Sequence, residues 1–203
     1  MNNFDLHTPT RILFGKGAIE KLREQIPAEA RVLITYGGGS VKKTGVLDQV
    51  LTALNGLDVL EFGGIEPNPS YETLMNAVKL AREEKVTFLL AVGGGSVLDG
   101  TKFIAAAAHY DADIDPWEIL ETYGSKIASA IPMGSVLTLP ATGSESNKGA
   151  VISRKTTGDK RAFMSSHVQP QFAILDPVYT YTLPPRQVAN GVVDAFVHTV
   201  EQY

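Results

Sequence analysis

The chain has 203 residues, 18 of them basic and 22 acidic, which gives a formal net charge of -4. This balance, without a block of consecutive Lys and Arg residues, argues against a nucleic-acid partner. Cysteine is absent, which excludes disulfides, thiolate zinc sites, iron–sulfur clusters and cysteine nucleophiles, so any metal must be bound by His, Asp, Glu or water. The start of the sequence lacks a secretory signal and no apolar run reaches the roughly 20 residues of a membrane span, so we expect a cytoplasmic protein with no membrane partner.

Apolar strands and helices alternate in the first half of the chain. Strands are expected at residues 11–14, 31–35, 57–62 and 87–92, and helices at 18–25, around 46–54, at 71–84 and from the glycines at 93–95 to 108. The run at 87–92 has no polar alternation, which is typical of a central parallel strand covered on both faces. This rhythm predicts an α/β fold with a parallel sheet, in which ligands bind beyond the carboxyl ends of the strands.

The alternation is looser beyond Asp111. We expect a short helix at 117–123, strands at 133–139 and 171–175, a hairpin of 149–153 with 160–165, and a last helix from about 186 that is broken near Asn190-Gly191. The helical pattern reaches Tyr203 without a C-cap glycine or a closing proline. We therefore expect the front part of a longer protein.

A glycine turn, Gly93-Gly94-Gly95, joins the strand at 87–92 to the next helix. A strand, a glycine turn and a helix N-terminus together offer free backbone N–H groups and a favourable dipole, which is typical of a phosphate site. The alternative is a tight connection that needs glycine only for steric reasons. Ser96 is expected to be the N-cap of the helix, and Asp99 is expected to complete a capping box with it.

A second glycine turn, Gly37-Gly38-Gly39-Ser40, follows the strand at 31–35. In dinucleotide folds an acidic residue here binds the ribose 2′-hydroxyl of NAD, whereas a 2′-phosphate requires donors and positive charge. Residues 36–44 contain no Asp or Glu but include Lys42 and Lys43, which favours NADP. Two alternatives stay open: a solvated helix start, and an NTP-binding phosphate loop for phosphoryl transfer in which Lys42 replaces the second glycine.

Two further groups could contribute chemistry. Asp194 and His198 are four residues apart, so on a helix they share one face and can bind one metal ion if further ligands join them. The alternative is a pair that only stabilises its helix. Ser144 follows Gly143 after an expected strand, but the full G-x-S-x-G pattern of a nucleophile elbow is missing, which argues against a hydrolase.

Several motifs in this order resemble the iron-containing, or group III, alcohol dehydrogenase family. They are Arg11 to Gly17, Pro67-Asn68-Pro69, Gly93 to Asp99, Pro140 to Ser146, Asp176-Pro177 with Leu183-Pro184, and Gly191 to Glu201, and they cover nearly all of the chain. The resemblance implies a Rossmann-like dinucleotide-binding domain at residues 1–183. It also implies that residues 184–203 form the first helix of an all-helical metal-binding domain.

The resemblance assigns roles to residues of both domains. It implies that Gly94, Gly95, Ser96 and Asp99 bind the cofactor pyrophosphate, that Asn68 lies near the adenosine, that Thr138, Thr142, Ser144 and Asn147 line the cofactor, and that Lys160 reaches the nicotinamide ribose. Asp194 and His198 match the first two of four ligands of a divalent metal, Fe²⁺ or Zn²⁺. The resemblance implies that the other two ligands are histidines beyond residue 203.

The resemblance implies that the protein reduces small aldehydes to alcohols with NADPH and a metal ion. The same chemistry run backwards is that of an alcohol dehydrogenase, and we expect a homodimer. A second hypothesis is that the chain is a dinucleotide-binding module without catalysis, which would explain the missing metal ligands. A third, less favoured, is phosphoryl transfer from NTP through Lys42 or Lys43.

Overall fold

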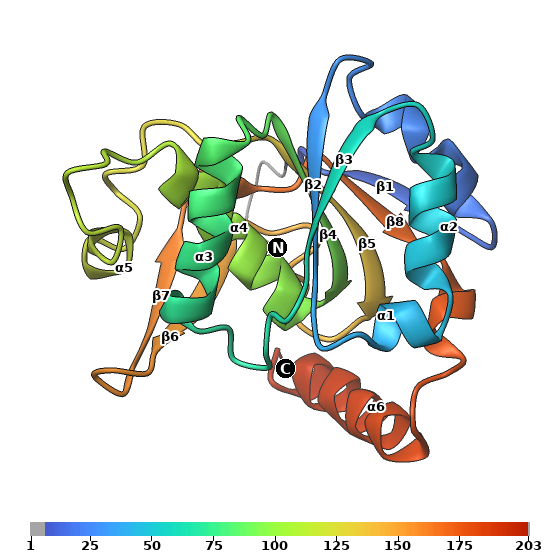
Figure 1. The fold of residues 1–203 in the computed structure, drawn as a ribbon. Helices are drawn as coiled ribbons and strands as arrows, with labels where there is room; N and C mark the ends of the chain where they lie inside the picture. Colours follow the sequence, from blue (N-terminus) through green and yellow to red (C-terminus); the bar gives the residue numbers. More distant parts are fainter. Residues whose placement is uncertain (1–6, 203) are drawn as a thin grey trace.

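The computed structural model describes residues 7–202 and contains a six-stranded parallel sheet with helices on both faces (Figure 1). The strand order is β1-β8-β5-β4-β2-β3, and all neighbours in it are parallel. The strands of the sheet are β1 (Arg11–Phe14), β2 (Arg31–Tyr36), β3 (Asp58–Phe62), β4 (Phe88–Gly94), β5 (Met133–Leu139) and β8 (Phe172–Leu175). This architecture confirms the expected α/β fold with a parallel sheet.

Helices and one hairpin complete the structure. The α-helices are α1 (Ser40–Lys43), α2 (Val46–Ala53), α3 (Tyr71–Glu83), α4 (Gly95–Ala108), α5 (Glu118–Glu121) and α6 (Pro185–Val200). Short 3-10 helices lie at η1 (Ala18–Lys21), η2 (Arg23–Gln25), η3 (Ser166–Val168) and η4 (Pro177–Thr180). The expected hairpin is present as antiparallel β6 (Gly149–Arg154) and β7 (Asp159–Met164). None of the helices within residues 7–202 has both the length and the apolar character needed to cross a membrane.

Strand β4 divides the hydrophobic core into two parts, because successive side chains of a strand point to opposite faces of the sheet. Leu89 and Ala91 pack on one face in a cluster with α3 and α4. Leu90 and Val92 pack on the other face in a cluster with η1 and α2. Figure 1 shows the same division, with α3 and α4 on one side of the sheet and α2 on the other. The expectation of a central strand covered on both faces is confirmed.

Two helix predictions are corrected. The segment expected to be one helix at 18–25 forms the 3-10 helices η1 and η2, and in that geometry the buried side chains of Ile19 and Leu22 lie one above the other. The expected break near Asn190-Gly191 is absent, and α6 continues through it. One glycine costs a helix only about 1 kcal/mol relative to alanine, and the other residues of this segment sustain the helix.

Candidate functional site

The two glycine turns lie side by side at one edge of the sheet. Tyr36 of β2 and Val92 of β4 are register partners in a parallel pair, so the turns that follow both strands leave the same edge. A Cβ added to Gly37 would lie 3.6 Å from Cγ2 of Val97, and one added to Gly93 would lie 2.7 Å from the same atom. Both turns therefore pack around the first turn of α4.

Helix α4 begins two residues earlier than the capping prediction required, at Gly95 instead of Val97. Its N-cap is Gly94 and no side chain caps it, so the expected capping box of Ser96 and Asp99 is wrong. The physical reason is that β4 extends to Gly94 by pairing with Leu139, which places Ser96 inside the first helical turn. The first N–H groups of an α-helix have no partner within the helix, and they form a site for an anion.

Glycine allows the loop after β5 to approach this helix N-terminus closely. A Cβ on Gly95 would lie 2.5 Å from Oγ1 and 2.6 Å from Cγ2 of Thr142, which is closer than real Cβ atoms come to a neighbour. A Cβ on Gly94 would lie 3.3 Å from Cβ of Leu139. Thr142 is thus placed over the start of α4, while Thr138 lies half-buried on β5 just before this loop.

A buried lysine joins the loop after β5 to α4. The side chain of Lys102 is 0% exposed, and its Nζ donates to Oγ of Ser144 over 2.9 Å, to Oδ1 of Asn147 over 2.9 Å and to the carbonyl of Gly149 over 2.8 Å. Ser144 in turn donates to Oδ1 of Asp99 over 2.7 Å. Three expected cofactor residues are therefore connected through a residue that the sequence reasoning missed.

The signal for Lys102 was its spacing, because residues three apart on a helix share a face and Asp99 was already a candidate. Burial lowers the pKa of Lys102 to about 8, although the charges of Asp99 and Glu145 oppose that change. Burial also raises the pKa of Asp99, against the hydrogen bonds from Ser144 and from the backbone of Val151. At neutral pH Lys102 is still an ammonium group with three donors for its three acceptors.

The hairpin β6–β7 connects two more of the expected residues. Nζ of Lys160, on β7, donates to Oδ1 of Asn68 over 2.8 Å, so these residues meet although they are far apart in the sequence. Asn68 belongs to the loop between β3 and α3, and it has a positive φ of 55°. Pro69, the next residue, lies against the first half of α4, 3.5 Å from where a Cβ on Gly100 would be.

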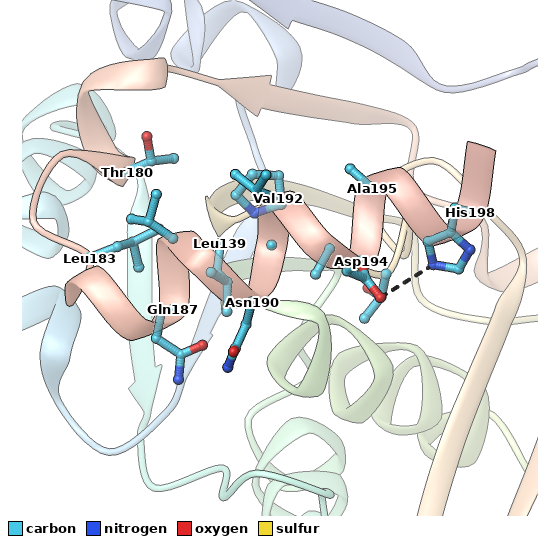
Figure 2. Close-up of a pocket in the computed structure, with 14 residues that line it drawn as sticks. Leu139, Thr180, Leu183, Gln187, Asn190, Val192, Asp194, Ala195 and His198 are labelled. Carbon is cyan, nitrogen blue, oxygen red and sulfur yellow. Dashed lines mark ion pairs between the residues drawn. The ribbon is translucent and has the colours of Figure 1, made fainter. Parts of the chain in front are cut away.

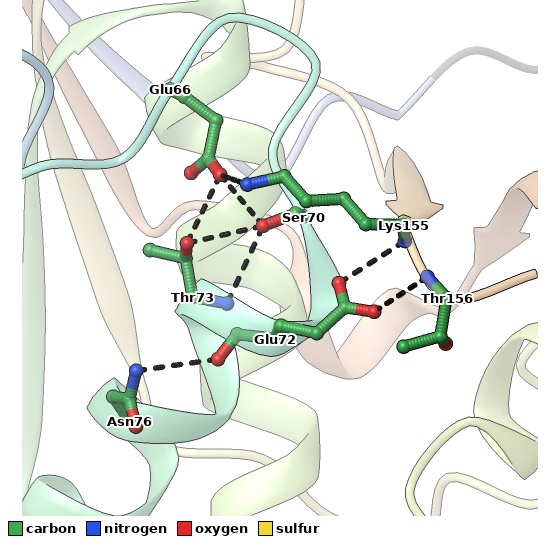
Figure 3. A network of polar contacts seen from close by, with 7 residues as sticks. All are labelled: Glu66, Ser70, Glu72, Thr73, Asn76, Lys155 and Thr156. Carbon is green, nitrogen blue, oxygen red and sulfur yellow. Dashed lines mark hydrogen bonds and ion pairs between the residues drawn. The ribbon is translucent and has the colours of Figure 1, made fainter. Parts of the chain in front are cut away.

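A polar network holds this hairpin against the start of α3 (Figure 3). Oε1 of Glu66 accepts from Nζ of Lys155 over 2.7 Å, from Ser70 over 2.6 Å and from Thr73 over 3.0 Å. The carboxylate of Glu72 accepts from the backbone N–H of Lys155 and of the residue after it. Burial raises the pKa of Glu66, but the hydrogen bonds outweigh burial and lower it to about 2. The network fixes the hairpin on which Lys160 lies.

The second glycine turn faces open space. Gly39 is in the left-handed region with φ of 101°, and α1 begins at the next residue, Ser40. A Cβ added to Gly38 or Gly39 would have no atom within 4 Å, whereas one on Gly37 would lie 3.1 Å from the carbonyl oxygen of Ile65. The turn therefore packs against the backbone of Ile65 at Gly37, whereas the space next to Gly38 is open.

A cavity of about 840 Å³ lies between the loop after β5 and α6 (Figure 2). Thr142 and Leu139 line it from the β5 side, and Asp194 and His198 line it from α6. Its size is that of a small-molecule pocket. The cavity thus connects the loop that lies over α4 to the expected metal pair.

Asp194 and His198 lie one turn apart on α6, with Oδ1 of Asp194 3.6 Å from Nε2 of His198 (Figure 2). One carboxylate oxygen and one imidazole nitrogen on the same face suit Fe²⁺ or Zn²⁺, so the donor chemistry fits the expected metal. Within residues 7–202, no third His, Asp or Glu joins them in a group that could hold an ion. Two side chains alone do not complete the coordination of such an ion.

Comparison with known proteins finds a family model and curated relatives that agree with one another, since all are alcohol dehydrogenases or aldehyde reductases. The family model "Iron-containing alcohol dehydrogenase" matches residues 9–177. The chain is 86% identical over 203 residues to the NADPH-dependent aldehyde reductase YqhD of Escherichia coli, covering 100% of this chain and 52% of that protein. It is 47% identical to NADP-dependent alcohol dehydrogenase 3 of Entamoeba histolytica, covering 100% of this chain and 53% of that protein.

A solved structure gives the same result for the fold. The crystal structure of Escherichia coli YqhD superposes with a TM-score of 0.95 and 86% sequence identity, covering 100% of this chain and 52% of that one. The chain spans about half the length of the curated relatives it matches. Its parallel sheet corresponds to the N-terminal part of these proteins. On the family match and the fold together, the chain belongs to the iron-containing alcohol dehydrogenase family.

Proposed function

We propose that this chain binds NADPH and contributes to the metal-assisted reduction of aldehydes to alcohols. The observation that carries the proposal is the arrangement at one edge of the sheet. Two glycine turns meet around the start of α4, and a cavity leads from there, past Thr142, to Asp194 and His198. The relatives named above as an NADPH-dependent aldehyde reductase and an NADP-dependent alcohol dehydrogenase support this assignment.

In this proposal the dinucleotide lies along the carboxyl ends of β4 and β2. Its pyrophosphate binds to the N–H groups at Gly94, Gly95 and Ser96, where the helix dipole favours an anion. The 2′-phosphate binds above Gly38 and Ser40. The loop from Thr142 to Asn147 lines the cofactor, Lys160 reaches the nicotinamide ribose, and Asn68 lies near the adenosine. The open space above Gly38 and the glycine cradle beneath Thr142 support these placements.

Asp194 and His198 would supply two ligands of Fe²⁺ or Zn²⁺ in the complete site. A divalent ion, when bound, polarises a carbonyl oxygen as a Lewis acid. The contribution of this chain is to hold the two ligands on one helix face and to orient the nicotinamide toward the same cavity. The separation of 3.6 Å between Oδ1 of Asp194 and Nε2 of His198 supports binding of one shared ion.

Residues 1–183 then form the dinucleotide-binding domain, and residues 184–203 begin a helical metal-binding domain. The exposed apolar side chains of α6 support this division, since Val192 is 66% exposed and Phe196 is 69% exposed. A surface of this kind is normally covered by other residues. Limited proteolysis within 181–184 should release a stable sheet domain if the boundary is correct.

The decisive experiment measures NADPH oxidation by the intact protein with a small aldehyde, before and after removal of divalent metal with a chelator. We expect metal removal to abolish turnover while NADPH still binds, as followed by its fluorescence. Asp194→Ala should have the same effect and should lower the metal content of the purified protein. Unchanged metal content and turnover in Asp194→Ala would contradict the metal assignment.

A second candidate function is dinucleotide binding without catalysis. It is favoured by the observation that, within the part of the chain that the structure describes, no third metal-ligating side chain joins Asp194 and His198. The same titration distinguishes the two functions. NADPH binding without aldehyde-dependent oxidation in the metal-loaded intact protein would favour the module.

We further propose a cytoplasmic homodimer. Among the described strands β1 lies at one edge of the sheet, and its side chains Ile12 and Phe14 are 48% and 75% exposed on the same face. An exposed apolar edge strand is normally covered by another chain or element. Light scattering that gives the mass of one chain at working concentration would contradict the dimer.

A further inference from the structure

A carboxylate lies beside the second glycine turn although the turn itself contains none. Glu61 is near the end of β3, in parallel register with Ile34 of β2, so its side chain is close to the carboxyl end of β2. Tyr36, the last residue of β2, donates from its hydroxyl to Oε2 of Glu61 over 3.1 Å. The sequence could not show this proximity, because Glu61 belongs to the next strand.

The same carboxylate is paired with a cation of the turn. Nζ of Lys42, on α1, lies 3.6 Å from Oε2 of Glu61 and 4.9 Å from the centroid of the Tyr36 ring. The neighbouring Tyr36 side chain, together with the charge of Glu61, raises the pKa of Lys42, against a smaller effect of burial. Lys42 is therefore held between a phenol ring and a carboxylate.

Backbone contacts fix this arrangement in place. A Cβ on Gly63 would lie 2.3 Å from Cε2 of the Tyr36 ring, so glycine is needed where the ring packs on the chain. The N–H of Gly64 donates to the carbonyl of Gly37 over 3.0 Å, and the N–H of Ile65 donates to the carbonyl of Tyr36 over 3.2 Å. The loop after β3 and the glycine turn thus form one unit, with Glu61 at its side.

We propose that Glu61 is a specificity-determining residue, which weakens binding of the NADPH 2′-phosphate and so narrows the preference for NADPH over NADH. This inference rests on the proposed function, because it requires the 2′-phosphate to bind at Gly37 to Ser40. Glu61 acts in two ways: it repels the phosphate, and it neutralises Lys42, which would otherwise attract it. A 2′-hydroxyl carries no charge, so NADH binding is insensitive to both effects.

The test replaces the carboxylate by an amide in the intact protein. Glu61→Gln keeps an acceptor for the Tyr36 hydroxyl and removes the charge. The dissociation constants of NADPH and NADH are measured by fluorescence titration at low and high salt. We expect NADPH to bind roughly two- to fivefold more tightly at low salt, which is the range of exposed charge interactions, and NADH to be unchanged. The gain should shrink at high ionic strength.

Asp58 provides a matched control on the same strand. It lies at the other end of β3 and pairs with Arg31, with Oδ2 3.0 Å from Nε. Asp58→Asn removes one carboxylate of an exposed ion pair and changes the net charge equally, yet it should leave the ratio of NADPH to NADH affinity unchanged. An equal change in the ratio of NADPH to NADH affinity in both variants would show an effect of net charge and would overturn the role of Glu61.

Two further measurements separate this inference from the proposed function. Wild-type protein should bind 2′,5′-ADP more tightly than 5′-ADP; if it does not, the 2′-phosphate site is wrong and both proposals fail. If it does, but Glu61→Gln leaves the NADPH to NADH ratio unchanged or lowers it, only the inference about Glu61 fails. Lys42→Met in the Glu61→Gln background should remove most of the gain, because Lys42 is the cation that the substitution releases.

Discussion

The ammonium group of Lys102 donates to the hydroxyl of Ser144 over 2.9 Å at a position where both side chains are buried. Ser144 also donates a hydrogen bond to Asp99. The loop after β5 is therefore bound to α4 by two side chains of that helix, Lys102 and Asp99. A buried charge is tolerated only when its donors are used. This relationship fixes the loop that carries Thr142 over the helix N-terminus.

Replacing Lys102 should loosen the loop from Thr142 to Asn147, which we call the cofactor loop because we propose that it lines the cofactor. Lys102→Met keeps the approximate length of the side chain but leaves the acceptors of Ser144, Asn147 and Gly149 without their donor. We expect a loss of about 3 kcal/mol in the free energy of unfolding and weaker NADPH binding. Urea denaturation and a fluorescence titration measure the two effects.

Thr101 is the control for Lys102 because it is the adjacent buried residue on α4. Its hydroxyl lies 2.6 Å from the hydroxyl of Thr35, which belongs to β2 and not to the cofactor loop. Thr101→Val should cost about 1 kcal/mol of stability and leave the NADPH affinity unaltered. If Lys102→Met bound NADPH as tightly as Thr101→Val does, the loop would not depend on the ammonium group.

The open face of the second glycine turn predicts a variant that folds normally but binds less NADPH. A Cβ on Gly38 would have no atom within 4 Å, so Gly38→Ala should leave the melting temperature unchanged. The added methyl group would occupy space that we assign to the 2′-phosphate. NADPH affinity should therefore fall about tenfold, which corresponds to a loss of about 1.4 kcal/mol in binding free energy. Calorimetry measures the melting temperature, and a fluorescence titration measures the NADPH affinity. Wild-type affinity in Gly38→Ala would mean that the phosphate binds elsewhere.

The network in Figure 3 predicts a dependence of stability on acid pH. Glu66 has a pKa of about 2 in the folded chain against its ordinary value of 4.5, because hydrogen bonds from Lys155, Ser70 and Thr73 outweigh burial. Between these values the unfolded chain takes up a proton and the folded chain does not. The free energy of unfolding should therefore fall as the pH falls through this window.

Glu66→Gln should remove part of this pH dependence and lower stability near neutral pH, where the ion pair with Lys155 is complete. Denaturation with urea from about pH 6 to about pH 3 measures the slope for each protein. Glu29→Gln, in the exposed turn before β2, serves as the control for loss of one carboxyl group. Parallel slopes for wild type and Glu66→Gln would refute the assignment.

Local patterns were sufficient to predict the sheet. The expected strands are all present, because apolar runs such as 87–92 can only be buried between two layers. The meeting of the two glycine turns also followed from the sequence, since parallel strands end at one edge. What failed was the helix start at Gly95, where pairing of β4 with Leu139 decided the boundary. No periodicity in the sequence reports such a pairing.

The candidate site was predictable only where its residues lie within one motif. Asp194 and His198 share a helix face by spacing alone, and the structure lines one cavity with both. Lys102 and Glu61 were missed because their partners, Ser144 and Lys42, belong to other elements. Contacts between distant segments require the topology, which single-sequence patterns do not specify.

The position of β1 in the sheet has a consequence for how the chain acquires its structure. β1 pairs only with β8 in the strand order, and Thr10 beside it bonds to Pro170, 160 residues later. During translation, β1 leaves the ribosome long before its partner β8, whereas β2, β3 and β4 can pair early. Long-range pairing of this kind slows folding, and pulsed hydrogen exchange should protect the amides of β4 before those of β1.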